Sequence, residues 1–310
     1  MSFSLTVLGS SSALPTSKRF PTAQVLKVHE RFFLIDCGEG TQIQLRRYKL
    51  PISRIHHIFI SHLHGDHVFG LFGLLSSMNL LGRNTDLTIH AHASMEDIVR
   101  YFISVFGTDL QYRIVFEPFP VRRQSLVYED RMLTVETIPL KHRIPTAGFV
   151  FREKKRPLNI RKEKVEQLNI PYREIVRIKA GSDFIAEDGK VHKNRELTLP
   201  EIKPRAYAYI SDTVYLEKIA EQIRDVDLLY HEATFLDSDR KLARLTGHST
   251  ALQAARLAQK AAVGKLLLGH FSSRYKNTGD FVEEAGQIFE NTVAVEDGDV
   301  FEVEEIRQRP

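Results

Sequence analysis

Four side chains able to bind a metal ion stand within six consecutive positions of the segment Ser61–His67 (SHLHGDH). The apolar run Ile58–Ile60 before this segment predicts a buried strand, and residues 70–78 after it predict a helix. Side chains two positions apart point the same way in an extended chain, so a turn between strand and helix can serve two adjacent metal ions. The segment therefore predicts a binuclear zinc hydrolase site, with His62, His64, Asp66 and His67 as ligands.

Further ligands must come from elsewhere in the chain, because two zinc ions need more donors than one turn supplies. The single cysteine, Cys37, excludes an internal disulfide and a thiolate-rich zinc site, which leaves histidine and carboxylate donors. Three later apolar runs each stop at a residue of this kind, and strand ends along one edge of a sheet can bring such residues together. These three candidates are His142, Asp212 and His270.

Two polar clusters near the end of the chain follow the same rule. The segment His231–Thr234 comes after an apolar run, and residues 247–250 precede a helix predicted over 251–261. We expect Ser249 to cap that helix, which leaves His248 free of a capping role on the rim of the site.

Three short β-type runs separated by turn residues open the chain and predict an antiparallel sheet. Asp36, at the end of the third run, is expected to form either an Asx turn or a hydrogen bond to a ligand histidine. Four other histidines lie in predicted strands and lack ligand spacing, so we interpret them as structural. They are His56, His57, His90 and His92.

The composition predicts one globular domain with a large core, because 43% of the 310 residues are hydrophobic. No apolar stretch approaches about 18 residues, the length that a membrane span needs, and the first residues lack the charged start of a signal peptide. We therefore expect a cytoplasmic protein that does not enter a membrane.

Positive charge is concentrated in one segment. The net charge is +4, but residues 152–195 hold 13 Lys/Arg and 7 Asp/Glu, a local balance of +6 that leaves −2 for the rest. Residues 152–203 interrupt the strand pattern, with a hairpin turn predicted at Glu187–Lys190, and lie between His142 and Asp212 in sequence. We expect an arm that emerges near the metal site and binds phosphates of a folded RNA without reading bases. The residues assigned to this contact are Arg152, Lys154, Lys155, Arg156, Arg161, Lys162 and Lys164.

The segment His62–His67 is similar to the HxHxDH signature of the metallo-β-lactamase superfamily. Together with residues 36–42 (DCGEGTQ), 231–234 (HEAT) and 247–250 (GHST), it makes nearly the whole chain resemble the ribonuclease Z family, the tRNA 3′-processing endonucleases, in their short bacterial form. The resemblance implies an α/β fold, an αββα sandwich, in a homodimer. Residues 1–151 and 204–310 would form the catalytic domain, and 152–203 the inserted basic arm that binds precursor tRNA.

The resemblance also implies roles for single residues. His62, His64 and His142 would bind one zinc ion, Asp66, His67 and His270 the other, and Asp212 would bridge the two. His248 would protonate the leaving oxygen, and Glu232 would help to orient His248. The implied catalytic residues are therefore Asp66, His248 and Glu232. The reaction would remove the 3′ trailer of a precursor tRNA and leave a 3′-hydroxyl on the tRNA.

The chain departs from the family pattern at two places. Phe20 follows Pro15–Arg19 where the family tends to carry asparagine, and Asn169–Arg173 stands where many members have a Gly-Pro motif in the arm. Both departures concern segments expected to touch RNA, and neither concerns a predicted metal ligand.

Two other functions compete with this interpretation. Another hydrolase of the superfamily, acting on a small phosphodiester, thioester or lactone, explains the metal site but leaves the basic arm without a role. An RNA-binding protein with a structural metal would close its site with four protein ligands. Seven candidate ligands for two ions leave open coordination positions, which favours an enzyme.

Overall fold

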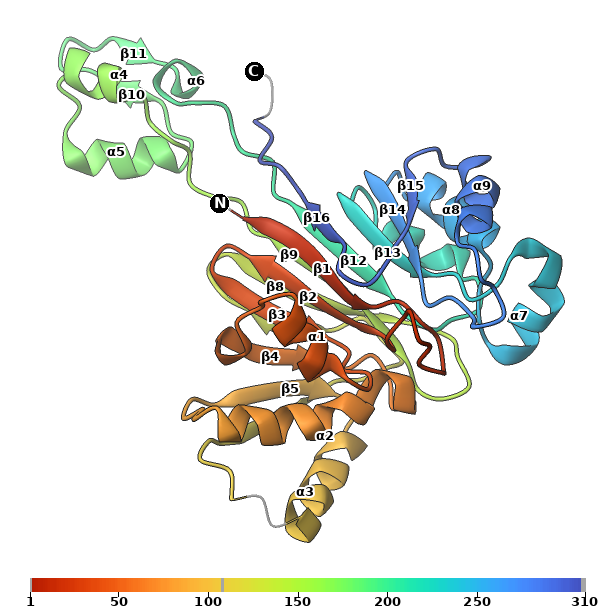
Figure 1. Ribbon diagram of the computed structural model, residues 1–310. Helices are drawn as coiled ribbons and strands as arrows, with labels where there is room; N and C mark the ends of the chain where they lie inside the picture. The colour runs from red at the N-terminus through yellow and green to blue at the C-terminus, as the bar shows by residue number, and fades with distance from the viewer. Residues whose placement is uncertain (1, 107–108, 308–310) are drawn as a thin grey trace.

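In the part of the chain that the computed structural model describes, residues 2–106 and 109–307, two seven-stranded sheets pack face to face. Helices cover the outer face of each sheet, as predicted for an αββα sandwich (Figure 1). The antiparallel opening is also confirmed in β1 (Phe3–Gly9), β2 (Ala23–Val28) and β3 (Arg31–Ile35). The first sheet is completed by β4 (Ile55–Phe59), β5 (Leu87–Ala91), β6 (Ile114–Pro118) and β16 (Val300–Glu302).

The second sheet uses strands from the later part of the chain. They are β7 (Leu126–Glu129), β8 (Leu133–Pro139), β9 (Ala147–Glu153), β12 (Ala206–Ile210), β13 (Leu228–Glu232), β14 (Lys265–Gly269) and β15 (Thr292–Ala294). Their order across the sheet is β15-β14-β13-β12-β9-β8-β7, and β12, β13 and β14 run parallel. The carboxyl ends of these three central strands therefore lie at the same edge.

Three helices cover the first sheet: α1 (Thr41–Arg47), α2 (Gly65–Leu80) and α3 (Ser94–Phe106). The second is covered by α8 (Ala251–Lys260) and α9 (Gly279–Gly286), with α7 (Arg240–Thr246) to one side (Figure 1). Short 3-10 turns occur at η1 (Ile52–Arg54), η2 (Glu217–Glu221) and η3 (Asp237–Asp239). No helix among the described residues has the length and apolar character needed to cross a membrane.

Aromatic side chains from the two sheets interlock in the middle of the sandwich. Phe33 and Phe59 of the first sheet and Phe151 of the second are completely buried, with ring centroids 5.3 to 6.1 Å apart. Truncating such a ring to alanine typically costs about 3–5 kcal/mol of stability. This packing fixes one sheet against the other, so side chains from both sheets can meet at a common edge.

The strand ends that carry the predicted ligands meet at one end of the sandwich. The chain leaves β4 toward Ser61, and β12 and β14 end just before Asp212 and His270. At this end the amide of Ala147, the first residue of β9, donates a hydrogen bond of 3.0 Å to the carbonyl of Ser61. The bond links the two sheets beside the ligands, where the parallel strands of both sheets finish.

Helix α2 begins earlier than the sequence predicts. The expected start was residue 70, where the apolar run begins, whereas the helix starts at Gly65 with His64 as its N-cap. Asp66 and His67 therefore lie in the first helical turn and not in a loop. Periodicity missed this turn because its residues are small or polar, and a carboxylate such as Asp66 is favourable at the positive end of a helix.

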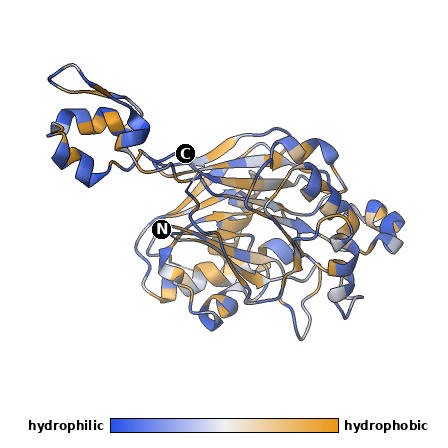
Figure 2. Ribbon diagram, turned by 90° about the horizontal axis from the view of Figure 1, so that it is seen from above, coloured by the Kyte–Doolittle hydropathy of each residue, from blue (hydrophilic) through white to orange (hydrophobic). Residues whose placement is uncertain are grey.

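The segment between β9 and β12 forms an arm that stands away from the sandwich (Figure 2). It contains α4 (Lys162–Gln167), α5 (Tyr172–Lys179), β10 (Phe184–Ile185), β11 (Val191–His192) and α6 (Asn194–Leu197). The predicted hairpin is confirmed, since β10 and β11 pair antiparallel around Gly189. A small core of its own holds the arm together, with Ile178 fully buried and Ile170, Phe184 and Leu197 nearly so.

The expectation that the arm emerges near the metal site is wrong. β9 carries the chain away from the site for seven residues, from Ala147 to Glu153, and β12 brings it back from Ala206. The arm therefore leaves the opposite end of the sheet, a separation on the order of 20 Å. The insertion lies between two site residues in sequence, but the strands β9 and β12 separate it from them in space.

Candidate metal centre

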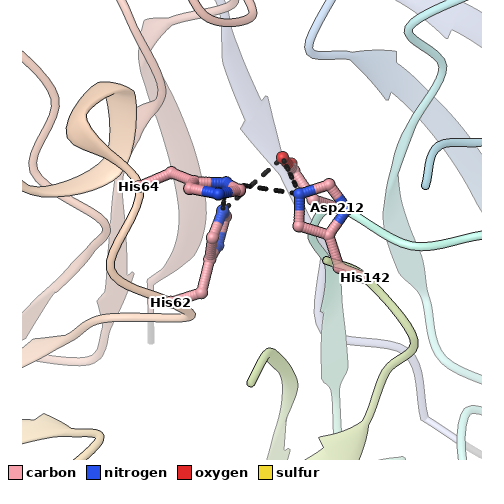
Figure 3. Close-up of side chains that lie close together, drawn as sticks. All are labelled: His62, His64, His142 and Asp212. Carbon is pink, nitrogen blue, oxygen red and sulfur yellow. Dashed lines mark hydrogen bonds and ion pairs between the residues drawn. The ribbon is translucent and has the colours of Figure 1, made fainter. Parts of the chain in front are cut away.

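The structure brings all seven predicted ligands together. Their donor atoms form sets in which every atom lies within 4.8 Å of the others. One set is His62, His64, His142 and Asp212, and a second is Asp66, His67 and His270. Figure 3 shows the first set, with His62 and His64 approaching from one side and His142 and Asp212 from the other.

Asp212 presents one carboxylate oxygen to each set. Its Oδ2 lies 3.5 Å from His62 Nε2 and 3.6 Å from His142 Nε2. Its Oδ1 lies 3.5 Å from His67 Nε2 and 3.2 Å from His270 Nε2. Asp212 is 2% exposed, so both oxygens are directed into the protein at the place where the two sets meet. This geometry suits a carboxylate that bridges two cations.

Unsatisfied atoms in the cluster indicate that a cation belongs there. His67 Nε2 and Asp212 Oδ1 are buried and have no hydrogen-bond partner among the residues that the structure describes, which is costly for polar atoms unless another group binds them. A cluster of imidazole nitrogens and carboxylates without cysteine is a donor set that zinc accepts. The residues present therefore fit a metal centre.

Asp36 orients two of the ligand histidines. Its Oδ2 accepts a 2.7 Å hydrogen bond from His67 Nδ1 and a 2.8 Å bond from the Ser61 hydroxyl, which lies 3.0 Å from His62 Nδ1. Because Ser61 gives its proton to Asp36, its oxygen is free to accept the Nδ1 proton of His62. Both imidazoles then keep an unprotonated Nε2 for metal. Of the two interpretations of Asp36 left open above, the structure confirms the hydrogen bond to a histidine, His67, whose role as a ligand stays a prediction.

Two more ligands are fixed in the same way. His142 Nδ1 donates to the carbonyl of Gly247 at 2.7 Å, and His270 Nδ1 lies 2.9 Å from the Thr234 hydroxyl. Gly247 has φ +84°, and a side chain there would place its Cβ 2.8 Å from His142 Nδ1. Glycine is therefore required for this carbonyl to approach the ring.

Burial and neighbouring charge set the protonation of the cluster. Burial lowers the pKa of His62 to about 4 and lowers the pKa of His64 and His142, so these imidazoles are neutral at pH 7, the form that binds metal. Burial would also lower the pKa of His67, but the carboxylates of Asp66, Asp212 and Asp36 outweigh it and raise that pKa. The carboxylates thus favour positive charge at the second set, from a proton or from a cation.

His248 and Glu232 form a buried pair at the edge of the cluster. His248 Nδ1 lies 3.1 Å from Glu232 Oε1 and 4.0 Å from Asp212 Oδ2. Burial alone would lower the pKa of His248, but the charge of Glu232 and its hydrogen bond raise that pKa to about 9. The same carboxylate accepts the amides of Thr213, Thr234 and Ser249, which hold it in place.

The predicted cap of helix α8 is wrong by one residue. Thr250 caps the helix, with its side chain accepting the Gln253 amide and Gln253 returning the bond, while the Ser249 hydroxyl donates to the carbonyl of Thr213 at 2.7 Å. Both residues are good caps, and the reciprocal bond with Gln253 three positions later favours Thr250. His248 is free of a capping role, as expected.

An open hollow of about 630 Å³ lies above the cluster. Its lining includes His64, Asp66 and His248, together with Phe69 and Arg143. The amide of Ala13, on the loop after β1, donates to Asp66 Oδ2 at 2.8 Å, so this loop forms part of the wall. Ser61, Thr234 and Ala13 were not predicted to contact the ligands. The first two lie inside recognised motifs, and the Ala13 contact depends on its backbone alone, which leaves no signal in the sequence.

Other predicted residues lie elsewhere. His57 and His90 are within 3.1 Å of each other, and burial lowers their pKa values to about 4 and about 3. His56 contacts Arg83, and His92 accepts the amide of Ser94. Neither pair joins a metal set among the described residues.

The seven arm residues assigned to RNA also differ in their surroundings. Arg152 belongs to β9 and donates to the carbonyls of Gln222 and Arg224, and Arg156 pairs with Glu153 and Glu305. Four more contact other protein groups: Lys154 contacts Glu129, Lys155 contacts Glu201, Arg161 contacts Thr198 and Lys164 contacts Gln167. The seventh, Lys162, is exposed. Their contact with RNA stays a prediction.

We predict that Asp36→Asn weakens metal binding by roughly 10- to 100-fold, because both the His67 and the Ser61–His62 hydrogen bonds lose their carboxylate. Metal affinity of the apoprotein, measured by competition with a coloured chelator, tests this directly. The matched control is Tyr207→Phe. Tyr207 lies on the same strand as Tyr209, and its buried hydroxyl is bonded to Gln24. Unchanged metal affinity in a folded Asp36→Asn protein would contradict the proposed orienting role.

The chain is similar in sequence and in fold to known proteins. A ribonuclease Z from Phocaeicola vulgatus is 48% identical over 98% of this chain and 99% of its own, and one from Porphyromonas gingivalis strain W83 is 44% identical over 94% and 96%. The crystal structure of human tRNase Z, short form, is 25% identical and superposes with a TM-score of 0.69 over 96% of this chain and 98% of its own. A metallo-β-lactamase fold protein from Bacillus subtilis, 19% identical with a TM-score of 0.68 over 98% and 100%, supports the fold.

The family model described as anti-Pycsar protein Apyc1 matches residues 3–104, a stretch that covers the first sheet as far as α3 and includes the segment Ser61–His67. The ribonuclease Z relatives extend the similarity over 94% to 98% of the chain. By its identity over nearly the whole length, the chain belongs to the ribonuclease Z family.

Proposed function

We propose that this protein is a zinc-dependent endoribonuclease that removes the 3′ trailer from precursor tRNA and leaves a 3′-hydroxyl on the tRNA. The observation that carries the proposal is Asp212, which offers one oxygen to each of two ligand sets at the floor of an open hollow. Sites of this kind suit hydrolysis of phosphodiesters. Membership of the ribonuclease Z family selects precursor tRNA among such substrates.

The ligand sets suggest how two zinc ions would be held. His62, His64 and His142 would bind one ion and Asp66, His67 and His270 the other, with Asp212 shared between them. The ions would supply an activated water and neutralise charge on the phosphate. Asp66 also fixes the wall of the hollow through the amide of Ala13, which gives it a second part in forming the catalytic site.

His248 is proposed to protonate the leaving 3′-oxygen of the tRNA, which would otherwise depart as a strongly basic alkoxide. Glu232 maintains the protonated imidazole by its charge and by the 3.1 Å contact with Nδ1, which leaves Nε2 of His248 to face the substrate. Because Glu232 is completely buried and held by several amides, it positions the ring as well as raising its pKa. Glu232 therefore acts through His248.

The arm is proposed to bind the body of the tRNA. It lies a strand length from the metal centre, so a folded RNA can contact both places at once, whereas a small phosphodiester cannot reach the arm. Its exposed basic residues are candidates for phosphate contacts that add affinity without reading bases. Before α5 they are Lys155 and Lys162, on α5 Arg173, Arg177 and Lys179, and beyond it Lys190, Lys193 and Arg195.

A homodimer is proposed from an apolar surface on α2 and α3. Tyr101 is 73% exposed, Phe106 69% and Leu80 87%, and Val105 and Ile98 are exposed on the same helix as Tyr101. Helix α3 already buries Met95 and Val99 against the first sheet, so Ile98, Tyr101 and Val105, at positions i, i+3 and i+7, form a second apolar face of this helix. Exposed apolar side chains gathered on one helix face are typical of protein interfaces. The cytoplasm remains the proposed location.

His248→Ala should lower turnover of precursor tRNA by roughly 10²- to 10⁴-fold, the contribution of a general acid. Hydrolysis of bis(p-nitrophenyl) phosphate should change far less, because p-nitrophenolate leaves without a proton. Parallel rate measurements on the two substrates test the role. Equal losses on both would mean that His248 serves the fold or substrate placement instead.

The pH dependence should follow the same pair. An acid catalyst must be protonated, so activity on precursor tRNA should decline as the pH rises through the pKa of His248, which Glu232 raises. Glu232→Gln removes that charge, and the alkaline limb of kcat/KM should move to lower pH. Profiles that coincide for the wild type and Glu232→Gln would exclude His248 as the acid controlled by Glu232.

Removing the arm should separate recognition from chemistry. Asn159 and Leu199 are adjacent, with a 2.7 Å bond between the Leu199 amide and the Asn159 carbonyl, so a short Gly/Ser linker can join them. This variant should keep its hydrolysis of bis(p-nitrophenyl) phosphate and lose affinity for precursor tRNA. In the intact protein that affinity should fall as salt is added. In a plot of the logarithm of the binding constant against the logarithm of the salt concentration, each neutralised phosphate should contribute a slope of somewhat less than one. Unchanged tRNA affinity in the linker variant would show that the arm does not bind the tRNA.

Placing a charge on the proposed dimer surface should dissociate the dimer. Tyr101→Glu should raise the dimer dissociation constant at least tenfold, measured by sedimentation equilibrium, because two glutamates would be buried in a symmetric interface. Tyr172→Glu, at an 81% exposed tyrosine on the arm, is the matched control and should leave the dimer intact. A wild type that is monomeric throughout, or equal effects of the two variants, would overturn the assignment.

A further inference from the structure

The segment after β16, residues 303–307, runs along the chain that returns from the arm. The amide of Lys203 donates to the carbonyl of Ile306 at 2.9 Å, and Ile202 pairs with Arg307 in an antiparallel bridge. The Arg307 side chain donates to the carbonyl of Pro200 at 3.3 Å. Figure 1 shows this C-terminal segment extending from β16 toward the arm. The returning linker, 198–205, thus has the C-terminal segment as a neighbour.

The same segment joins a buried ionic cluster at the base of the arm. Glu153 is the last residue of β9, and Arg205 directly precedes β12. Their side chains form an ion pair at 2.8 Å, with Glu153 5% exposed and Arg205 2% exposed. Arg156, on the outgoing linker, bonds both Glu153 and Glu305, and Arg205 donates to the carbonyl of Val303 at 3.0 Å. Groups from both linkers and from the C-terminal segment therefore meet in one network.

The C-terminal segment is itself anchored to the sandwich. β16 pairs with β1, with Phe301 opposite Leu5, and the amide of Val303 donates to the carbonyl of Phe3 at 2.8 Å. The segment is therefore a continuation of an edge strand of the first sheet that extends to linkers belonging to the second. A connection of this kind resists rotation of the arm about its two linkers, because a third segment of the same chain holds the returning linker.

We propose that residues 303–307 act as a splint that fixes the direction of the arm relative to the metal centre. This inference rests on the proposed function of the arm. A tRNA held by the arm reaches the metal centre efficiently only if the arm points in the right direction, and an effective concentration is lost when linker geometry no longer matches the two sites. The residues of the splint need not touch RNA, so they are positioning residues.

The test is truncation after Val303, which keeps the residue bonded to Phe3 and Arg205 and removes the groups that contact the arm linkers. We expect kcat/KM for precursor tRNA to fall roughly 10- to 100-fold, by analogy with lost bivalent geometry. Hydrolysis of bis(p-nitrophenyl) phosphate and the salt dependence of tRNA affinity should stay unchanged, because the metal centre and the phosphate contacts remain. Unchanged processing of precursor tRNA by the folded, truncated protein would overturn the proposal.

Point variants separate a splint from a direct RNA contact. Glu305→Gln, which weakens the bond to Arg156, should lower processing of precursor tRNA, while Glu304→Gln makes the same charge change at the exposed neighbouring residue and should have little effect. If Arg307→Gln alone reproduced the full loss and reduced the salt slope, Arg307 would be a phosphate contact and the splint would be wrong. Failure of the Asn159–Leu199 linker variant to lose tRNA affinity would instead count against the proposed arm function.

Discussion

The structure depends most on a single buried carboxylate shared between two groups of histidines. Asp212 has almost no exposed surface, and burying a carboxylate is costly unless positive charge or hydrogen-bond donors meet it. Asp212 follows a strand of the second sheet, β12, whereas His62 and His67 follow a strand of the first, β4. The two sheets must therefore be packed in a fixed position, which the interlocked rings of Phe33, Phe59 and Phe151 provide. Metal binding would then stabilise the fold as well as equip it for catalysis.

The ligand residues are held by a second group of buried polar residues. Asp36 is hydrogen-bonded to His67 directly and to His62 through Ser61. Glu232 contacts His248, and the Thr234 hydroxyl connects Glu232 to His270. Tyr209 donates to Asp36 at 2.5 Å from the same strand that leads to Asp212. Such bonds select which nitrogen of each imidazole carries the proton, and they restrict the direction in which its partner nitrogen points.

Much of the centre could be predicted from the sequence because its signals are local. The spacing of His62, His64, Asp66 and His67 is short, and His142, Asp212 and His270 each follow an apolar run, so strand ends could be inferred without tertiary information. Asp36 could only be left between two interpretations, since its hydrogen bond to His67 spans 31 positions. The start of α2 was missed because its first turn is polar.

The position of the arm was predicted wrongly for a different reason. Its existence followed from charge and a broken strand pattern, but its direction depends on β9 and β12, which carry the chain to the far end of the sheet. The C-terminal segment beside the arm left no sequence signal, because a contact between Lys203 and Ile306 depends on backbone atoms. Tertiary pairings of this kind are invisible to local periodicity.

In the proposed function, affinity and chemistry belong to different ends of the molecule, the arm and the metal centre. A folded RNA that spans both would be bound at one end and cut at the other by a water molecule. Mapping both ends of the products from one precursor tRNA with a 3′ trailer is the most direct test of this account. It predicts a 3′-hydroxyl on the tRNA and a 5′-phosphate on the trailer; a 2′,3′-cyclic phosphate on the tRNA would show that the ribose hydroxyl attacked instead, and would contradict hydrolysis at a two-metal centre.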